Sequence, residues 1–239
     1  MPAKWFSSSF MRLVALAAGL ALISAHAHAD NRFSGDLTVF TLDDTSAGSC
    51  NFMDVPRMAE VNYAAMNDAQ WAESTMCGRC ASVTCIDDRC GENRGRIEIV
   101  HILDHCPECK YGDLAVSPSV FRSVTGHDPH RLKASWDFVD CPAQGNIKFC
   151  LKEGSDPSWM AIQPTNMVTG VQDFKINGQD TTLLPSGFYY LLDRDSAAPT
   201  DLSSVRVSVE SVTGEVVEDT VSLTAGSCTE GEVQFTRSS

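Results

Sequence analysis

The stretch from Ile102 to Pro118 concentrates side chains that can do chemistry. Cysteine and histidine bind zinc, a Cys-x-x-Cys pair can exchange disulfides, and two carboxyl groups can act as acid and base in glycoside hydrolysis. Three chemistries therefore compete for one set of side chains. The chemically active residues of this stretch are Asp104, His105, Cys106, Glu108, Cys109 and Asp113.

Residues 1–29 have the pattern of a secretory signal peptide. Lys4 and Arg12 flank the start of an apolar run, and Ala27 and Ala29 fit a small-residue cleavage site. The apolar run is 11 residues long, shorter than the roughly 20 that span a bilayer. We therefore expect a secreted, extracellular protein that has no membrane contact after cleavage.

The exported part of the chain is strongly acidic. Residues 1–29 contain two cations and no acid, so their removal changes the formal charge from −13 to −15. Nucleic acids, anionic membranes and demethylated pectin would be repelled by this charge at long range. The expected partner is therefore a neutral polysaccharide or another protein. We expect the chain itself to be a monomer.

The cysteines allow a zinc interpretation and a redox interpretation. Cys77–Cys80 and Cys106–Cys109 have the spacing of a four-thiolate zinc site. However, ten cysteines in an exported chain favour disulfides. A redox-active Cys106–Cys109 pair would need a helix that begins at the pair, but the sequence from Lys110 onward predicts a loop. We therefore predict disulfides, no metal and no cofactor.

Local patterns predict the elements that position the opening stretch. Alternation over 96–104 predicts a β-strand that ends at Asp104. Ser117 and Pro118 predict the start of a short helix, and Gly126 its end. A second short helix is expected within 61–71.

The chain beyond Cys141 has a different character. It holds only two of the ten cysteines, so packing must stabilise it. Asn177–Gly178 lies between two strand-like runs and predicts a hairpin turn. Alternating residues over 205–210, followed by a turn and a run over 215–221, complete a pattern typical of an antiparallel β-sandwich.

Several motifs, in this order and spacing, resemble the expansin and expansin-like family, particularly its microbial members. They are spread over nearly the whole exported chain, and their order is more specific than any one of them. The motifs are Gly35–Thr38, Gly48–Asn51, Cys77–Cys80, Ile102–Pro107, Gly112–Phe121, Lys152–Ser155 and Trp159–Gln163.

The resemblance implies a mainly β protein of two domains. Residues 30–143 would form a six-stranded double-psi β-barrel, and residues 144–239 an immunoglobulin-like β-sandwich that binds carbohydrate. Trp71 and Trp136 are then expected to pack in the barrel. The resemblance implies three disulfides, and we pair the remaining four cysteines as the last two bonds. The five expected bonds are Cys50–Cys77, Cys80–Cys141, Cys85–Cys90, Cys106–Cys109 and Cys150–Cys228.

The resemblance also implies a barrel groove in which two acids matter. Asp104 matches the first acid and Thr38 matches a groove threonine, but Ala115 stands where the family has its second acid. Asp113 is a candidate substitute, although two residues of strand displace it by about 6–7 Å. Proton transfer and hydrogen bonding work within about 3 Å. We therefore expect weak or absent wall loosening and no hydrolysis.

His101 and His105 are not expected to bind a metal or a ligand. His101 shares a strand face with apolar residues, and we expect it to be a hydrogen-bonded core histidine. His105 follows Asp104, and we expect it to be exposed in a loop, with an influence on Asp104 as the alternative.

Aromatic side chains of the second domain would bind glucan by stacking on sugar rings. Trp159 matches the second of two adjacent family tryptophans, and Tyr189 and Tyr190 lie near a third aromatic position. The alternative for each is a place in the sandwich core.

The function expected from this sequence is binding of plant-type cell-wall polysaccharide, namely cellulose and possible matrix glycans such as xyloglucan or xylan. The protein would not be an enzyme. The second interpretation is an exported binding or effector module without loosening activity, and an endoglucanase is the third.

Overall fold

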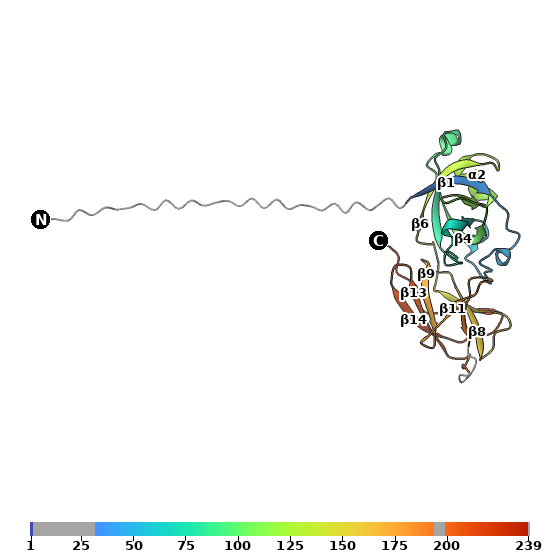
Figure 1. Cartoon of the computed structure of the whole chain (residues 1–239), viewed down its shortest axis with the longest axis vertical. Coiled ribbons are helices and arrows are strands. Elements are labelled where there is room, and N and C mark those ends of the chain that lie inside the picture. The colour runs from blue at the N-terminus through green and yellow to red at the C-terminus, as the bar shows by residue number, and fades with distance from the viewer. Residues whose placement is uncertain (2–31, 194–198, 239) are drawn as a thin grey trace. The chain divides into compact units, whose positions relative to one another are not determined.

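The computed structural model describes Met1, residues 32–193 and residues 199–238 (Figure 1). The described residues from 32 onward belong to one compact unit. The expected signal peptide, apart from Met1, lies outside the described residues. Among those that are described, no helix has the length and apolar character needed to cross a bilayer.

Six strands close into a barrel in the order β1-β5-β2-β4-β3-β6 (Figure 1). The pairs β1·β5 and β2·β4 are parallel, and the other neighbours are antiparallel. Trp136 is buried in the barrel core, as expected. The strands are β1 (Phe33–Val39), β2 (Tyr63–Asn67), β3 (Cys80–Cys85), β4 (Ile97–Cys106), β5 (Leu114–Val116) and β6 (Leu132–Val139).

Short helices connect the barrel strands. The helix α2 (Pro118–Thr125) begins at the side-chain cap of Ser117 and ends at Gly126, so this prediction is confirmed. The expectation of a helix over 61–71 is wrong for most of its length, because Tyr63–Asn67 is a buried strand and only Asp68–Trp71 forms the one-turn helix α1. Pairing on both edges of β2 outweighs the helix propensity of its alanines. The 3₁₀ turns are η1 (Thr45–Ala47), η2 (Arg57–Glu60) and η3 (Asp88–Asn93).

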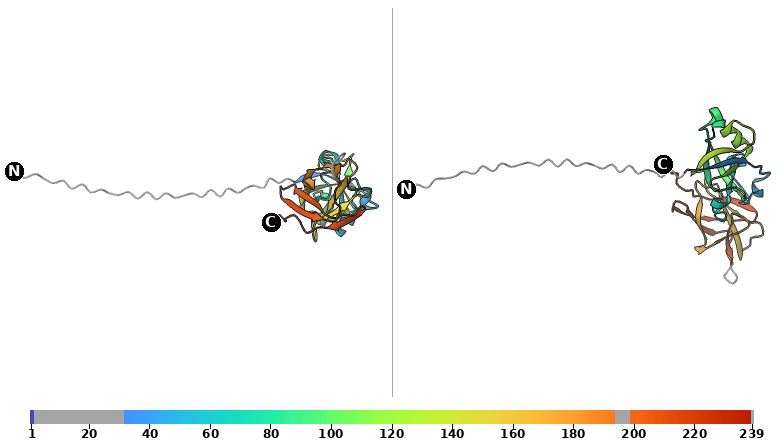
Figure 2. Two further views of the ribbon diagram at one scale, coloured as in Figure 1. Left: turned by 90° about the horizontal axis from the view of Figure 1, so that it is seen from below. Right: turned by 45° about the horizontal axis from the view of Figure 1, so that its top comes forward.

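Two antiparallel sheets follow the barrel (Figure 2). Their apolar side chains share one core. Asn177 and Gly178 both have positive φ, as the predicted hairpin turn requires. A mainly β protein with a six-stranded barrel followed by a β-sandwich is thus confirmed. One sheet contains β9 (Val171–Ile176), β10 (Gln179–Asp180), β13 (Val205–Ser211) and β14 (Val216–Val221). The other contains β7 (Lys148–Leu151), β8 (Trp159–Thr165), β11 (Thr182–Leu183), β12 (Tyr190–Asp193) and β15 (Ser227–Glu230).

All ten cysteines are paired, so none is left to ligate zinc as a thiolate. The pairs coincide with those expected from the sequence. Four bonds fasten the barrel and its loops, and one joins β7 to β15. The bonds are Cys50–Cys77, Cys80–Cys141, Cys85–Cys90, Cys106–Cys109 and Cys150–Cys228.

A loop that leaves the barrel, residues 48–54, hydrogen-bonds to the sandwich, and we call it the junction loop. Gln163 of β8 is fully buried beneath it. The Gln163 Oε1 accepts from the Met53 amide at 2.8 Å, and its Nε2 donates to the carbonyls of Cys50 and Asn51 at 3.3 and 3.1 Å. The Phe188 amide also donates to the Cys50 carbonyl. Buried polar groups of the barrel loop and of the sandwich therefore satisfy each other.

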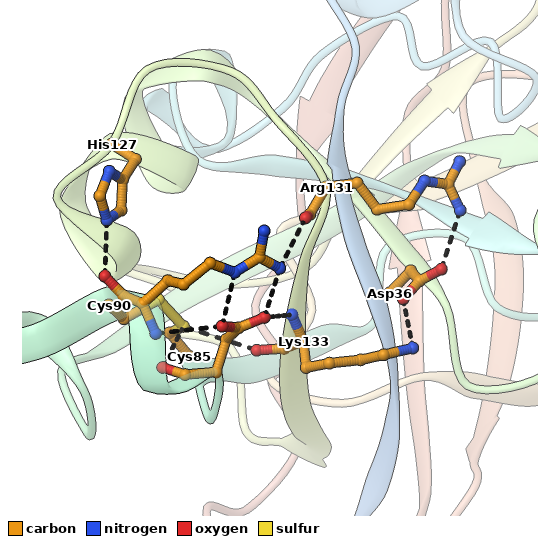
Figure 3. Close-up of polar contacts among 8 residues, drawn as sticks. Asp36, Cys85, Cys90, His127, Arg131 and Lys133 are labelled. Atoms are coloured by element: carbon orange, nitrogen blue, oxygen red, sulfur yellow. Dashed lines mark hydrogen bonds and ion pairs between the residues drawn. A yellow bond between two sulfur atoms is a disulfide. The ribbon is translucent and has the colours of Figure 1, made fainter.

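A network of ion pairs ties the start of β6 to its neighbours (Figure 3). Arg131 and Lys133 both donate to Asp36 of β1, and the Lys133 amide donates to Asp87 at the start of η3. These contacts, with Lys133 the largest, hold the pKa of Asp36 below its usual range. The Arg89 side chain does the same for the pKa of Asp87. Arg131 and Lys133 are thus paired with Asp36, and Arg89 is paired with Asp87. We therefore assign these charged side chains a structural role.

His101 of β4 is buried between Tyr63 of β2 and Cys80 of β3, and it is only 3% exposed. Neither ring nitrogen has a hydrogen-bond partner within the described residues. The expected burial is therefore found, but the expected hydrogen bonding is not. Burial lowers the pKa of His101 to about 4.

We predict that His101 makes the protein less stable as the pH falls from about 6.5 to about 4. In that window the unfolded chain binds a proton at this residue and the folded chain does not, which removes about 3 kcal/mol of stability. Urea unfolding at pH 7 and pH 4.5 should show a smaller acid-induced loss for His101→Phe than for the wild type. The exposed His130, replaced by Asn, is the control. An identical loss in wild type and His101→Phe would contradict the assignment.

Candidate functional site

The outer face of the barrel carries a row of four paired residues, which we call the barrel row. Thr38 of β1 pairs with Ala115 of β5, which pairs with Ala65 of β2. Ala65 pairs in turn with Asp104 of β4. Directly paired residues project from the same face of a sheet, so these four side chains share one surface. Two of the residues expected in the groove, Thr38 and Asp104, thus stand at its two ends.

A bulge in β4 brings Asp104 into this row. The register between β2 and β4 shifts so that Ala64 pairs with Ile102 and Ala65 pairs with Asp104. Leu103 is left without a partner in the ladder and packs into the sandwich core instead. Bulges of this kind redirect a side chain at the cost of one ladder position.

The junction loop holds the Asp104 carboxylate. Its Oδ1 accepts from the Ser49 amide at 2.8 Å, the Ser49 hydroxyl at 2.6 Å and the His105 amide at 2.8 Å. Gly48 allows this approach, because a Cβ there would lie 2.4 Å from the Leu103 carbonyl oxygen. Among the described residues no hydrogen bond reaches Oδ2, which leaves one oxygen to accept from a ligand hydroxyl. The sequence motif Gly48–Asn51 contains Ser49, but its role depends on a contact 55 residues away.

Ala115 makes the centre of the barrel row apolar. It is 4% exposed and packs with Ala65 and Cys106, and the half-buried Phe40 lies against them. It is two strands from Asp104, or about 10 Å between Cα atoms. The barrel row therefore contains a single carboxyl group.

Asp113, the candidate substitute, is occupied elsewhere. Its Oδ1 accepts from the Asp36 amide at 2.7 Å and its Oδ2 from the Lys110 amide at 2.9 Å. It is 7% exposed and is not a member of the barrel row. Both oxygens of this buried side chain accept from backbone amides, so we assign it a structural role.

Close to Asp104, His105 and Trp71 form a stacked pair. Their rings are 4.9 Å apart and tilted by 11°, and His105 Nε2 lies 3.0 Å from an oxygen of Asp68. The expectation that His105 is an exposed loop residue is wrong, because its side chain is 20% exposed. The sequence predicts only that Trp71 packs in the barrel, and it gives no signal that Asp68 contacts His105. Nothing local in the sequence indicates a stack across 34 residues.

Trp159 lies on the outer face of the five-stranded sheet. It begins β8, where Met160 and Ile162 point into the sandwich core, so alternation turns Trp159 to the other side. It is half-buried, and Asp156 Oδ1 accepts from its amide at 3.0 Å. An aromatic side chain at this position can offer a ring edge or face to a ligand.

Tyr189 and Tyr190, the other two candidates, offer no such surface. Tyr190 is 6% exposed and stacks on Phe174 in the sandwich core at 5.0 Å. Tyr189 is 2% exposed, and its hydroxyl donates to the Asn51 carbonyl of the junction loop. Alternation sends one tyrosine inward, and the junction loop covers the other. We therefore leave both out of the binding surface.

Comparison with known proteins points to one family, although no protein-family model matches the chain. The chain is 27% identical over 124 residues to Expansin-YoaJ of Bacillus subtilis, covering 51% of this chain and 52% of that protein. It is 24% identical over 190 residues to Expansin-like protein 1 of Dictyostelium discoideum, covering 74% of this chain and 63% of the relative. The chain is expansin-like. The matched stretches span under two thirds of the length of both expansin relatives.

Solved structures show the same fold. The apo expansin of Clavibacter michiganensis superposes with a TM-score of 0.70 at 21% identity, covering 87% of this chain and all of that one. A mutant of that expansin in complex with cellohexaose superposes equally well, at 22% identity. The barrel followed by antiparallel sheets is thus the expansin fold.

We predict that Asp113 contributes to stability and not to ligand binding. Asparagine has only one acceptor oxygen. In Asp113→Asn its NH₂ group would therefore face one of the two backbone N–H groups, and that hydrogen bond would be lost. Loss of this buried hydrogen bond should lower the free energy of unfolding by about 1–3 kcal/mol in urea titrations. Asp128→Asn, at an exposed acid, should change it little. Unchanged stability together with altered glucan binding would instead make Asp113 a groove acid.

Proposed function

We propose that this expansin-like protein binds neutral cell-wall polysaccharide, cellulose or a matrix glycan, and does not hydrolyse it. The observation that carries this proposal is the single acid of the barrel row. Glycoside hydrolysis generally needs two carboxyl groups about 5–9.5 Å apart, one of them protonated. Ala115 occupies the position of the second acid, and both oxygens of Asp113 accept backbone hydrogen bonds.

Two surfaces support glycan binding. Along the barrel row, the Asp104 Oδ2 can accept a hydrogen bond from a sugar hydroxyl, and the Thr38 hydroxyl can either donate or accept one. Trp159 can cover an apolar ring face of a sugar. The Clavibacter michiganensis expansin mutant was crystallised with cellohexaose, which supports a cello-oligosaccharide as the ligand of this chain too.

Charge and disulfides support a neutral extracellular substrate. A net charge of −15 on the exported part leaves binding to an uncharged glycan unaffected at long range. Five disulfides are typical of proteins that work outside the cell. We place the protein in the extracellular space, as a monomer.

Ala115 also favours a second candidate function, a polysaccharide-binding or effector module without wall loosening. In expansins the acid at this position is the one expected to matter most for loosening. Its replacement by a buried methyl group leaves no donor or acceptor at the centre of the barrel row. We therefore propose binding as the main activity and weak or absent loosening.

We predict that Trp159→Ala reduces binding to insoluble cellulose roughly three- to tenfold, since aromatic stacking is worth about 0.5–1.5 kcal/mol. The melting temperature should stay nearly unchanged, because the side chain lies outside the sandwich core. Val216→Ala, at an exposed apolar residue of the other sheet, is the matched control and should bind as wild type does. A large loss of stability in Trp159→Ala would place this tryptophan in the core and contradict its binding role.

We predict weak creep of acid-treated plant wall strips with the wild type and stronger creep with Ala115→Asp, which restores an acid to the barrel row. Ala115→Ser tests whether polarity alone is enough. Strong creep with the wild type would refute the proposed loss of loosening. Release of reducing ends from soluble glucan, abolished by Asp104→Asn, would make the protein an endoglucanase instead.

A further inference from the structure

Arg79, the residue before Cys80, carries a charge without an acidic partner. Its Nη1 donates only to the Met76 sulfur at 3.4 Å, and its guanidinium carbon lies 3.5 Å from the centre of the Phe138 ring. Every ion pair found among the described residues belongs to another cation. Burial lowers the pKa of Arg79 to about 10. Arg79 is half-buried, and holding a charge there without an acidic partner is unfavourable. The Phe138 ring offsets part of this cost but leaves the guanidinium N–H groups free to bind an anion.

Arg79 lines a cavity of about 500 Å³ between the end of β6 and loops of the sandwich. A cavity of this volume falls within the range of small-molecule sites. Gly170 lets the arginine stem lie flat against the wall, because a Cβ there would be 2.6 Å from Arg79 Cγ. Thr169, Thr213 and Asp140, which carry two hydroxyls and a carboxylate, also line the cavity.

The lining selects the chemistry of the ligand. A guanidinium is suited to a carboxylate, which it can bind through two parallel hydrogen bonds. Asp140, whose oxygens accept from the amide and hydroxyl of Ser238, opposes a second negative charge and can accept from a hydroxyl. A ligand with one carboxylate and several hydroxyls fits both groups.

We propose that this cavity binds a hexuronate unit, with its carboxylate on Arg79 and its hydroxyls toward Asp140 and the two threonines. Neither Trp159 nor any residue of the barrel row lines this cavity, so the proposal does not depend on the glycan binding proposed there. A protein of charge −15 repels a polyanion, but a single carboxylate among neutral sugars is compatible with it. The cavity would thus recognise a hexuronate side group on an otherwise neutral glycan, or the free sugar acid.

The test is a titration of the full exported protein with sodium D-glucuronate at constant ionic strength, followed by NMR. Saturable shifts are expected with glucuronate and none with D-glucose at equal concentration. Arg79→Gln should weaken binding at least about tenfold, because it removes the charged donor. Arg206→Gln, which removes an exposed cation of β13 that does not line the cavity, should bind as the wild type does.

Stability provides the second arm. Arg79→Gln is expected to melt no lower than the wild type, because it removes an unpaired, desolvated charge. If that variant does not fold, Arg79→Lys, which keeps the charge and loses the forked geometry, should bind several-fold more weakly. Three results would each overturn the proposal. They are absence of saturable glucuronate binding, equal binding by wild type and the Arg79 variant, and acetate or sulfate binding as tightly as glucuronate.

Discussion

The hydrogen bonds between Gln163 and the junction loop are the interaction on which the site depends. They join a loop of the barrel to the outer face of a sandwich sheet, and Cys50–Cys77 fixes the same loop to the barrel wall. Ser49, one residue before this disulfide, holds one oxygen of Asp104. The orientation of the one acid in the barrel row is therefore set by a loop that the sandwich keeps in place.

In the proposed function, the barrel row is a binding surface that lacks a second carboxyl group for bond cleavage. Thr38 and Asp104 stand at its ends, and the middle is two alanines beside a disulfide. Such a surface can exchange hydrogen bonds with sugar hydroxyls at its ends and exclude water between them. The barrel row has no second carboxyl group to supply a proton or activate water, and this supports the proposal of binding without hydrolysis.

Local signals predicted the parts of the fold that depend on neighbours in sequence. The capped helix α2 and the turn at Asn177 follow from propensities that act within a few residues. Long-range contacts decided the rest. β2 is a strand because it is paired on both edges. Tyr189 is covered by a loop from the barrel. The ring of His101 is buried where no described group can hydrogen-bond to it. The place of Asp104 was predictable from its motif, but the bulge and Ser49 that position it were not.

The most direct test of the account is one NMR experiment on isotopically labelled protein lacking residues 1–29, with cellohexaose, followed over days. The account predicts saturable shifts at the Trp159 indole and at backbone amides next to Asp104 and Thr38, and an oligosaccharide that stays intact throughout. Cleavage of cellohexaose, or saturable binding that leaves both of these surfaces unchanged, would contradict it.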